Sequence, residues 1–161
     1  MAQVNTKDFS TLPVGRLGLI PLQSCRPLGE KVDEWLVQWR KERISPELDS
    51  FAFEGYRRDS YIVDVKTPRF GSGEGKGEIG ESVRGDDIYL MVDVCNHSLS
   101  YRISGFTNLM SPDDHFQDLK RAIAAIGGKA RRINVIMPFL YEGRQHRRTK
   151  RESLDCALML Q

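Results

Sequence analysis

Short apolar runs alternate with helical patterns along most of the chain. Residues 15–22 and 86–95 are dense in apolar side chains and are bounded by polar or turn residues, as is typical of buried strands. Residues 60–65 and 133–137 repeat this pattern in shorter form. Because such runs alternate with helical segments, we predict an α/β fold with a mainly parallel sheet and helices on both of its faces.

Two segments carry apolar residues at clear helical spacing. Residues 24–43 contain a stripe of five such side chains, Leu28, Val32, Trp35, Leu36 and Trp39. We interpret the two tryptophans as core or interface packing rather than a ligand cage. A second helix is predicted from a serine cap at Ser111 to Gly127, because a proline and two aspartates suit its first turn. A last helix is predicted over residues 152–160.

Three segments lack a periodic pattern. Residues 44–59 are interpreted as a connection, and residues 96–110 as an irregular excursion or a short extra hairpin. Residues 69–85, RFGSGEGKGEIGESVRG, are rich in glycine, but they lack the Gly-Lys-Ser/Thr and the following helix of a phosphate loop. We therefore expect an antiparallel, glycine-rich hairpin near residues 69–85.

The composition indicates one domain without a membrane or disulfide signature. We assign residues 15–161 to that domain and residues 1–14 to a flexible N-terminus. The formal net charge of +2 gives no global basic field of the kind that nucleic-acid binders carry. No signal peptide and no membrane span of roughly 18 apolar residues is visible, so no membrane partner is expected. The three scattered cysteines favour a reducing cytoplasm.

Positive charge is concentrated after residues 133–137, in a segment with four arginines: Arg144, Arg147, Arg148 and Arg151. Guanidinium groups donate bidentate hydrogen bonds to phosphate oxygens. In α/β proteins, ligands bind beyond the carboxyl ends of parallel strands. A phosphorylated small molecule is therefore the favoured ligand. A solvated basic face and an RNA-binding patch remain alternatives, although no RNA-binding signature or aromatic stacking platform is visible.

Other candidate chemistry is weak. Asp113, Asp114 and His115 are adjacent, and adjacent helical residues do not face one another, so they are a poor metal site. We expect the aspartates to cap the helix and His115 to lie at the surface or an interface. Cys156 lies on an apolar helical face and is expected to pack. No nucleophile signature supports a hydrolase.

The glycine-rich segment and the arginine segment together resemble a known family. The matching runs are FGSGE and EIGESVRG within residues 70–85, PDD and DLKRAI within residues 112–123, ARRINVIMP at residues 130–138, and YEGRQHRR at residues 141–148. They resemble the amino-terminal signature of ribose-phosphate pyrophosphokinase, or PRPP synthetase. The resemblance implies a phosphoribosyltransferase-like (type I) α/β domain, and it places the family's second domain outside this chain.

The resemblance also implies an activity and its site. The family transfers the diphosphoryl group of ATP to the C1 hydroxyl of ribose 5-phosphate with Mg²⁺, whose protein ligands are expected outside this chain. One part of the implied ATP site belongs to a neighbouring subunit and comprises Phe70, Ser72 and Glu74. The other part holds ATP from its own subunit and comprises Arg144 and Gln145.

Two further pairs of residues receive roles by the same resemblance. Arg147 and Arg148 correspond to basic residues of a mobile catalytic loop. Ser82 and Arg84 match a regulatory phosphate site at a subunit interface. A homo-oligomer is therefore expected, without nucleic acid as a partner.

The chain departs from the family pattern at three positions. Ser72 replaces an aspartate or asparagine that reads adenine, His146 replaces an aspartate, and Thr149 stands where an acidic residue is common. We expect the chain alone to be inactive, since half of the family's active site is absent from it. The alternative is a non-catalytic regulatory homologue that associates with active synthetases.

Overall fold

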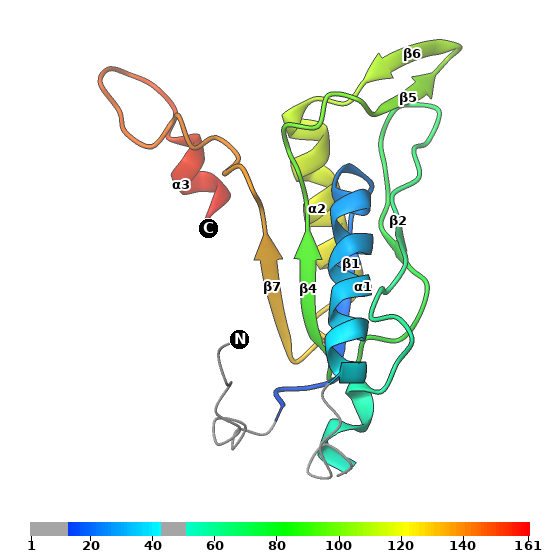
Figure 1. The fold of residues 1–161 in the computed structure, drawn as a ribbon. Coiled ribbons are helices and arrows are strands. Elements are labelled where there is room, and N and C mark those ends of the chain that lie inside the picture. Colours follow the sequence, from blue (N-terminus) through cyan, green and yellow to red (C-terminus); the bar gives the residue numbers. More distant parts are fainter. Residues whose placement is uncertain (1–12, 43–50) are drawn as a thin grey trace.

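The computed structural model describes residues 13–42 and 51–161, so residues 1–12 of the predicted N-terminus and residues 44–50 of the predicted connection lie outside the described residues. Its centre is a parallel sheet of three strands, in the order β1 (Leu17–Pro21), β4 (Asp87–Met91) and β7 (Arg132–Ile136). Two main helices flank the sheet (Figure 1). The predicted α/β fold with a mainly parallel sheet is confirmed.

Alternate residues of the strands face different helices. Leu19 of β1 packs in one apolar cluster with Val37 of α1 (Arg26–Glu42). Its neighbour Ile20 packs in the other cluster with Leu119 of α2 (Pro112–Ile126). Because side chains alternate across a strand, each face of the sheet receives its own helix. A 3-10 turn at Gln23–Cys25 leads into α1, and another spans Phe51–Tyr56.

The predicted strand at residues 60–65 is mostly wrong. Within it, only Ile62 pairs with the central sheet, through a parallel bridge to Leu19 of β1. The Leu19 amide donates to the Tyr61 carbonyl and the Val63 amide donates to the Leu19 carbonyl, both at 2.8 Å. The chain then leaves the sheet. It forms β2 (Val65–Lys66), which pairs antiparallel with β3 (Glu78–Ile79). The glycine-rich hairpin is thus confirmed, although it spans residues 65–79.

Residues 96–110 contain an extra hairpin, one of the two structures expected there. Strands β5 (Ser100–Ile103) and β6 (Phe106–Leu109) pair antiparallel. Ser104 and Gly105 join them with φ of 49° and 87°, the left-handed conformation that a two-residue hairpin turn requires. The β5–β6 hairpin projects beyond the end of the sheet (Figure 1).

Within the apolar stripe of α1, Val32 and Leu36 pack against a core cluster of this chain, but the two tryptophans do not lie in the core. Trp35 and Trp39 are 55% and 50% exposed, with their ring centroids 6.0 Å apart. The buried positions are instead Gly29, Asp33 and Val37. Asp33 accepts hydrogen bonds from the Tyr61 amide at 2.6 Å and from the Ser60 hydroxyl at 2.7 Å. This polar anchor turns the tryptophan side of the helix outward, so the core half of the prediction is wrong.

Helix α2 begins as predicted. The Ser111 hydroxyl accepts from the Asp114 amide, and the Asp114 carboxylate accepts from the Ser111 amide, a reciprocal cap. Gly127 ends the helix in a left-handed conformation. The expected surface position of His115 is wrong, because this residue is 2% exposed. It shares the buried face of α2 with Leu119, and its Nε2 lies 2.7 Å from the Asn96 carbonyl oxygen.

The C-terminal part is less buried than predicted. In β7, Val135 and Ile136 are 44% and 40% exposed, because β7 has β4 on one side and no second strand partner among the described residues. The last helix, α3 (Asp155–Met159), begins later than predicted, because Glu152 instead accepts hydrogen bonds from Thr149. Cys156 is buried in α3 as predicted.

Candidate functional site

The arginine loop, residues 137–154, connects β7 to α3 and is attached to α2 at its start. Tyr141 stacks on Phe116 with ring centroids 4.3 Å apart, and its hydroxyl donates to Asp113 at 2.7 Å. The hydrogen bond to the Asp113 carboxylate, together with burial, raises the pKa of the Tyr141 phenol. The loop therefore begins at a fixed point over the first turn of α2.

Gln145 holds the C-terminal end of the arginine loop by bonding to Ser153 and Cys156. Its side-chain amide donates to the Ser153 carbonyl at 2.9 Å, and its carbonyl accepts from the Cys156 amide at 3.4 Å. Four exposed arginines lie in the same loop: Arg144, Arg147, Arg148 and Arg151. Their side chains make no hydrogen bond or ion pair with any residue in 13–42 or 51–161. Their guanidinium groups are thus available to an anion.

The glycine-rich loop, residues 67–77, connects β2 to β3 and turns tightly at its tip. The Phe70 amide donates to the Glu74 carbonyl at 2.7 Å, and the Gly73 amide donates to the Phe70 carbonyl at 2.9 Å. The Phe70 ring is 53% exposed. The Ser72 hydroxyl donates to the Glu74 carboxylate at 2.9 Å. An exposed ring beside a carboxylate can contact a flat, hydrogen-bonding group such as a base.

A buried ion pair fixes the base of the glycine-rich loop. The Arg69 side chain is 9% exposed and lies 3.0 Å from the Asp118 carboxylate on α2. Arg121 contacts the other oxygen of the same carboxylate at 2.7 Å. The sequence indicated no role for Arg69, because its partner Asp118 is distant along the chain and no local motif connects the two.

The glycine-rich loop and the arginine loop lie beyond opposite edge strands of the central sheet, β1 and β7. The glycine-rich loop follows the segment that pairs with β1, whereas the arginine loop follows β7. Figure 1 shows them on opposite sides of the molecule. Because the two loops lie apart in one copy of the chain, we expect a site that uses residues of both loops to draw on a second copy.

Ser82 and Arg84 lie in a third place, on an open groove of about 490 Å³ between the β3–β4 connection and the end of α2. Lys129 lines the same groove and adds a second positive charge. The Arg16 guanidinium donates to the Ser82 carbonyl at 3.0 Å and pairs with Asp86 at 2.8 Å. These contacts fix the backbone of the connection and leave Arg84 exposed at the groove.

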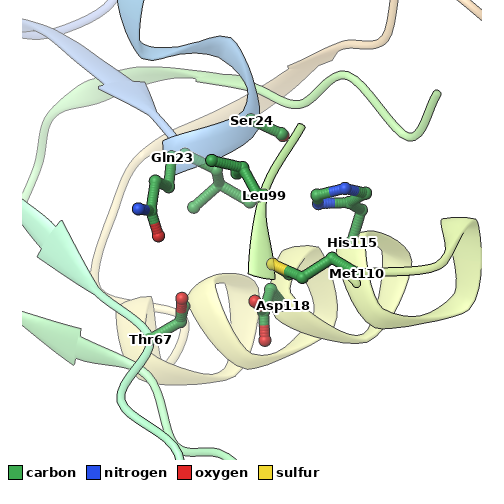
Figure 2. Close-up of a pocket in the computed structure, with 8 residues that line it drawn as sticks. Gln23, Ser24, Thr67, Leu99, Met110, His115 and Asp118 are labelled. Carbon is green, nitrogen blue, oxygen red and sulfur yellow. The ribbon is translucent and has the colours of Figure 1, made fainter. Parts of the chain in front are cut away.

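A small cavity lies between the end of β1, α2 and the base of the β5–β6 hairpin (Figure 2). Gln23, His115 and Asp118 are among the residues that line it. Its volume of about 10 Å³ is room for one water at most. It is a packing defect rather than a site for a nucleotide.

Comparison with known proteins identifies the family. A family model described as the N-terminal domain of ribose phosphate pyrophosphokinase matches residues 17–161. The chain belongs to this family. Phosphoribosylpyrophosphate synthetase from Mycobacterium smegmatis has a similar structure, with a TM-score of 0.58 and 20% sequence identity over 89% of this chain and 37% of that chain. No curated protein sequence matches.

Membership in the ribose phosphate pyrophosphokinase family confirms the resemblance and the fold that it implied. The roles of individual residues in ATP or phosphate binding stay predictions. The chain spans 37% of the length of the mycobacterial synthetase chain. No helix in the described parts of the chain is long and apolar enough to cross a membrane.

The described residues do not fit a protein-bound Mg²⁺ ion. Residues 13–42 and 51–161 contain no group of three His, Cys, Asp or Glu side chains placed to hold a metal. The buried carboxylates of Asp87 and Asp118 are already paired, with Arg132 at 2.6 Å and Arg69 at 3.0 Å.

Proposed function

We propose that this chain is the ATP-binding and assembly domain of a ribose-phosphate diphosphokinase. The whole enzyme transfers the diphosphoryl group of ATP to ribose 5-phosphate, with Mg²⁺ carried by the ATP, and makes PRPP for nucleotide biosynthesis in the cytoplasm. The observation that carries the proposal is the set of exposed arginines after β7 whose side chains have no hydrogen bond or ion pair within the described part of the chain, in a family match that covers residues 17–161. Three free cysteines suit a reducing compartment.

The chemistry asked of the arginine loop is electrostatic. Phosphoryl-type transfer depends on clamped phosphates, neutralised charge and alignment more than on covalent help from the protein. In our proposal Arg144 binds the ATP phosphates, Gln145 orders the loop beside them, and Arg147 and Arg148 move over the transferred group. The ordered start of the loop at Tyr141 and its exposed middle support a loop that is attached at both ends and free between them.

The base of ATP is proposed to bind against a second copy. Phe70 offers an exposed ring and Glu74 a carboxylate, and the glycine-rich loop that carries them lies on the side of the molecule away from the arginine loop (Figure 1). Because Ser72 donates to the Glu74 carboxylate at 2.9 Å, part of the acceptor capacity of Glu74 is already used. Selectivity for adenine is therefore expected to be lower than in a protein with an acidic or amide side chain at position 72.

The groove at Ser82 and Arg84 is proposed to bind a regulatory phosphate. Two cations, Arg84 and Lys129, lie on it, and it is open to solvent. Inorganic phosphate should then protect the chain against thermal unfolding, and Arg84→Ala should abolish that protection while leaving binding of ATP at the other site intact.

Titration of the chain with Mg²⁺–ATP by calorimetry tests the proposed nucleotide site. Each of Arg144→Ala and Arg147→Ala should weaken binding by about tenfold, the size of one lost hydrogen bond to a charged group. Arg131→Ala is the matched control, since Arg131 is an exposed arginine at the other end of β7. Equal affinity in all variants would contradict the proposal.

An assay with ATP, Mg²⁺ and ribose 5-phosphate tests completeness. We expect no PRPP from this chain alone, because the described residues contain no metal-binding cluster and the chain spans 37% of the mycobacterial synthetase. Normal turnover by this chain alone would contradict the proposal that it carries only the ATP-binding part of the active site.

A second candidate is a regulatory homologue without catalysis. It is favoured by Ser72, which is bonded to Glu74, and by Thr149, whose hydroxyl donates to Glu152 at 3.2 Å instead of supplying a negative charge. In that case the chain should co-elute with an active PRPP synthetase and change its turnover. An unchanged turnover of the active synthetase in the presence of this chain would exclude the candidate.

A further inference from the structure

The β5–β6 hairpin has one face directed at the rest of the molecule. Tyr101 and Ile103 are half-buried, whereas Arg102 and Leu109 are exposed, as the alternation of a strand requires. Ile103 is opposite Phe106 across the hairpin, and Ser100 is opposite Leu109. The half-buried face therefore rests on a neighbouring segment, and the contacts identify that segment as the glycine-rich loop.

The first contact is between Ile103 and the tip of the loop. Gly73 has a φ of 93°, and a Cβ added to it would lie 2.6 Å from Ile103 Cδ1. The Ile103 side chain thus packs directly against the Gly73 backbone. The Gly73 amide is the donor that closes the turn onto the Phe70 carbonyl at 2.9 Å. Ile103 consequently contacts the residue whose amide closes the tip of the loop.

The second contact is at the base of the loop. The Arg69 guanidinium lies 5.0 Å from the centroid of the Tyr101 ring, a cation–π distance. The Tyr101 hydroxyl donates to Asp114 at 3.4 Å, while Arg69 pairs with Asp118 at 3.0 Å. Arg69 is thereby enclosed between the hairpin and α2, one residue before Phe70.

A glycine-rich loop needs such external support. Gly71, Gly73, Gly75 and Gly77 give it many backbone conformations, and each glycine loses more entropy on ordering than another residue does. The hydrogen bonds inside the loop, such as those from the Phe70 and Gly73 amides, oppose that entropy only in part. Contacts from outside the loop favour one conformation of the segment that carries Phe70, Ser72 and Glu74.

We propose that the β5–β6 hairpin is a positioning element for the glycine-rich loop, with Ile103 supporting its tip and Tyr101 its base. The expected effect of the hairpin on ATP affinity rests on the proposed function. The expected effect of the hairpin on the conformation of the loop does not. Ile103 and Tyr101 are positioning residues, because in this proposal they act on the ligand through Phe70 and Glu74.

Hydrogen exchange of the 161-residue chain tests the proposal without a ligand. Ile103→Ala should raise the exchange rates of the Phe70 and Gly73 amides by about fivefold to tenfold, since it removes apolar contact over the turn. Leu109→Ala, on the opposite face of the same hairpin, is the matched control and should leave both rates unchanged. Ile103→Val should restore most of the protection.

A second variant guards against general unfolding. Tyr101→Leu keeps an apolar side chain and removes the ring beside Arg69, and it should raise exchange at Phe70 while the amides of β4 keep their wild-type rates. Loop exchange equal to that of Leu109→Ala in both Ile103→Ala and Tyr101→Leu would overturn the proposal. Faster exchange in the loop and in β4 alike would also overturn it, because the hairpin would then support the whole fold.

An ATP titration of the same proteins separates the two proposals. If ATP binds the wild-type chain, Ile103→Ala should raise the Kd by about threefold to tenfold and Leu109→Ala should not, in proportion to the lost order of the loop. Failure of the wild-type chain to bind ATP would contradict the proposed function alone, because the exchange rates would still decide whether the hairpin orders the loop.

Discussion

At the scale of single residues, Tyr141 joins the arginine loop to α2 through a stack and a hydrogen bond. Tyr141→Phe keeps the ring on Phe116 and removes the hydroxyl that donates to Asp113 at 2.7 Å. We expect the free energy of unfolding in urea to fall by about 0.5–1 kcal/mol, since the pair is partly exposed. Trypsin should also cleave faster after Arg144, while its cleavage elsewhere is unchanged.

The same hydrogen bond has a pH dependence with a definite sign. The bond to Asp113 and burial place the pKa of folded Tyr141 above the value of about 10 that it has when unfolded. Its contribution is therefore complete below about pH 10 and is lost as the pH rises further, because the unfolded chain ionises first. The stability difference between wild type and Tyr141→Phe should shrink at about pH 11; an unchanged difference would contradict this reasoning.

Asp114 is expected to make the cap of α2 sensitive to acid. Burial raises the pKa of its carboxyl, but hydrogen bonds from Ser111 and the charge of Arg69 outweigh burial and place the pKa below its ordinary value. The resulting stabilisation is present above about pH 4 and is lost as the pH falls through the folded pKa. Asp114→Asn should therefore differ from wild type in its urea midpoint at pH 7 and approach it at about pH 3.

Some single-residue features could be predicted from the sequence, and others could not. The cap at Ser111 was predictable, because its partner Asp114 lies three residues away on the same helix. The burial of His115 and the exposure of Trp35 were not, because both depend on which side of a helix meets the sheet. That orientation follows from distant contacts such as Asp33 with the Tyr61 amide.

At the scale of elements, the β2–β3 hairpin lies close against the backbone of α2. A Cβ on Gly77 would be 2.6 Å from the Arg121 carbonyl oxygen, which cannot move without disturbing the helix. Gly77→Ala should therefore lower the free energy of unfolding by about 1–3 kcal/mol in a urea titration. The matched control is Gly71→Ala, where a Cβ meets nothing within 4 Å and φ is not positive. Equal stability of the two variants would show that hairpin and helix can separate freely.

Elements with local signals were predicted better than those defined by pairing. Helix α2 and strands β1, β4 and β7 follow from apolar periodicity and caps. Strand β2 has only two residues, and its partner β3 lies on the other side of a glycine-rich loop. Strand propensities do not predict which residues of the two strands pair. The hairpin at residues 100–109 is defined by contacts with Arg69 and Gly73, which the sequence leaves unspecified.

At the scale of the whole molecule, the parts of the predicted ATP site are distributed over two sides of the sheet. The resemblance assigned Phe70 and Arg144 to different subunits, and the structure places their loops beyond opposite ends of the sheet order. Whether two copies join them is a matter of assembly, and neither the sequence nor a single chain determines it. The exposed Trp35 and Trp39 likewise leave the interface half of their interpretation a prediction.

Mixing two defective chains tests the shared site directly. If each site takes Phe70 from one copy and Arg144 from its neighbour, Phe70→Ala and Arg144→Ala should each weaken ATP binding alone. In a random mixture, half of the pairs combine both chains and carry one intact site, so about a quarter of all sites should regain wild-type affinity. A mixture of Arg144→Ala with Arg147→Ala should regain none, because every arginine loop then carries one defect. If neither mixture regains wild-type ATP affinity, Phe70 and Arg144 do not belong to one shared site. If only the first mixture regains it, two copies of the chain build one site.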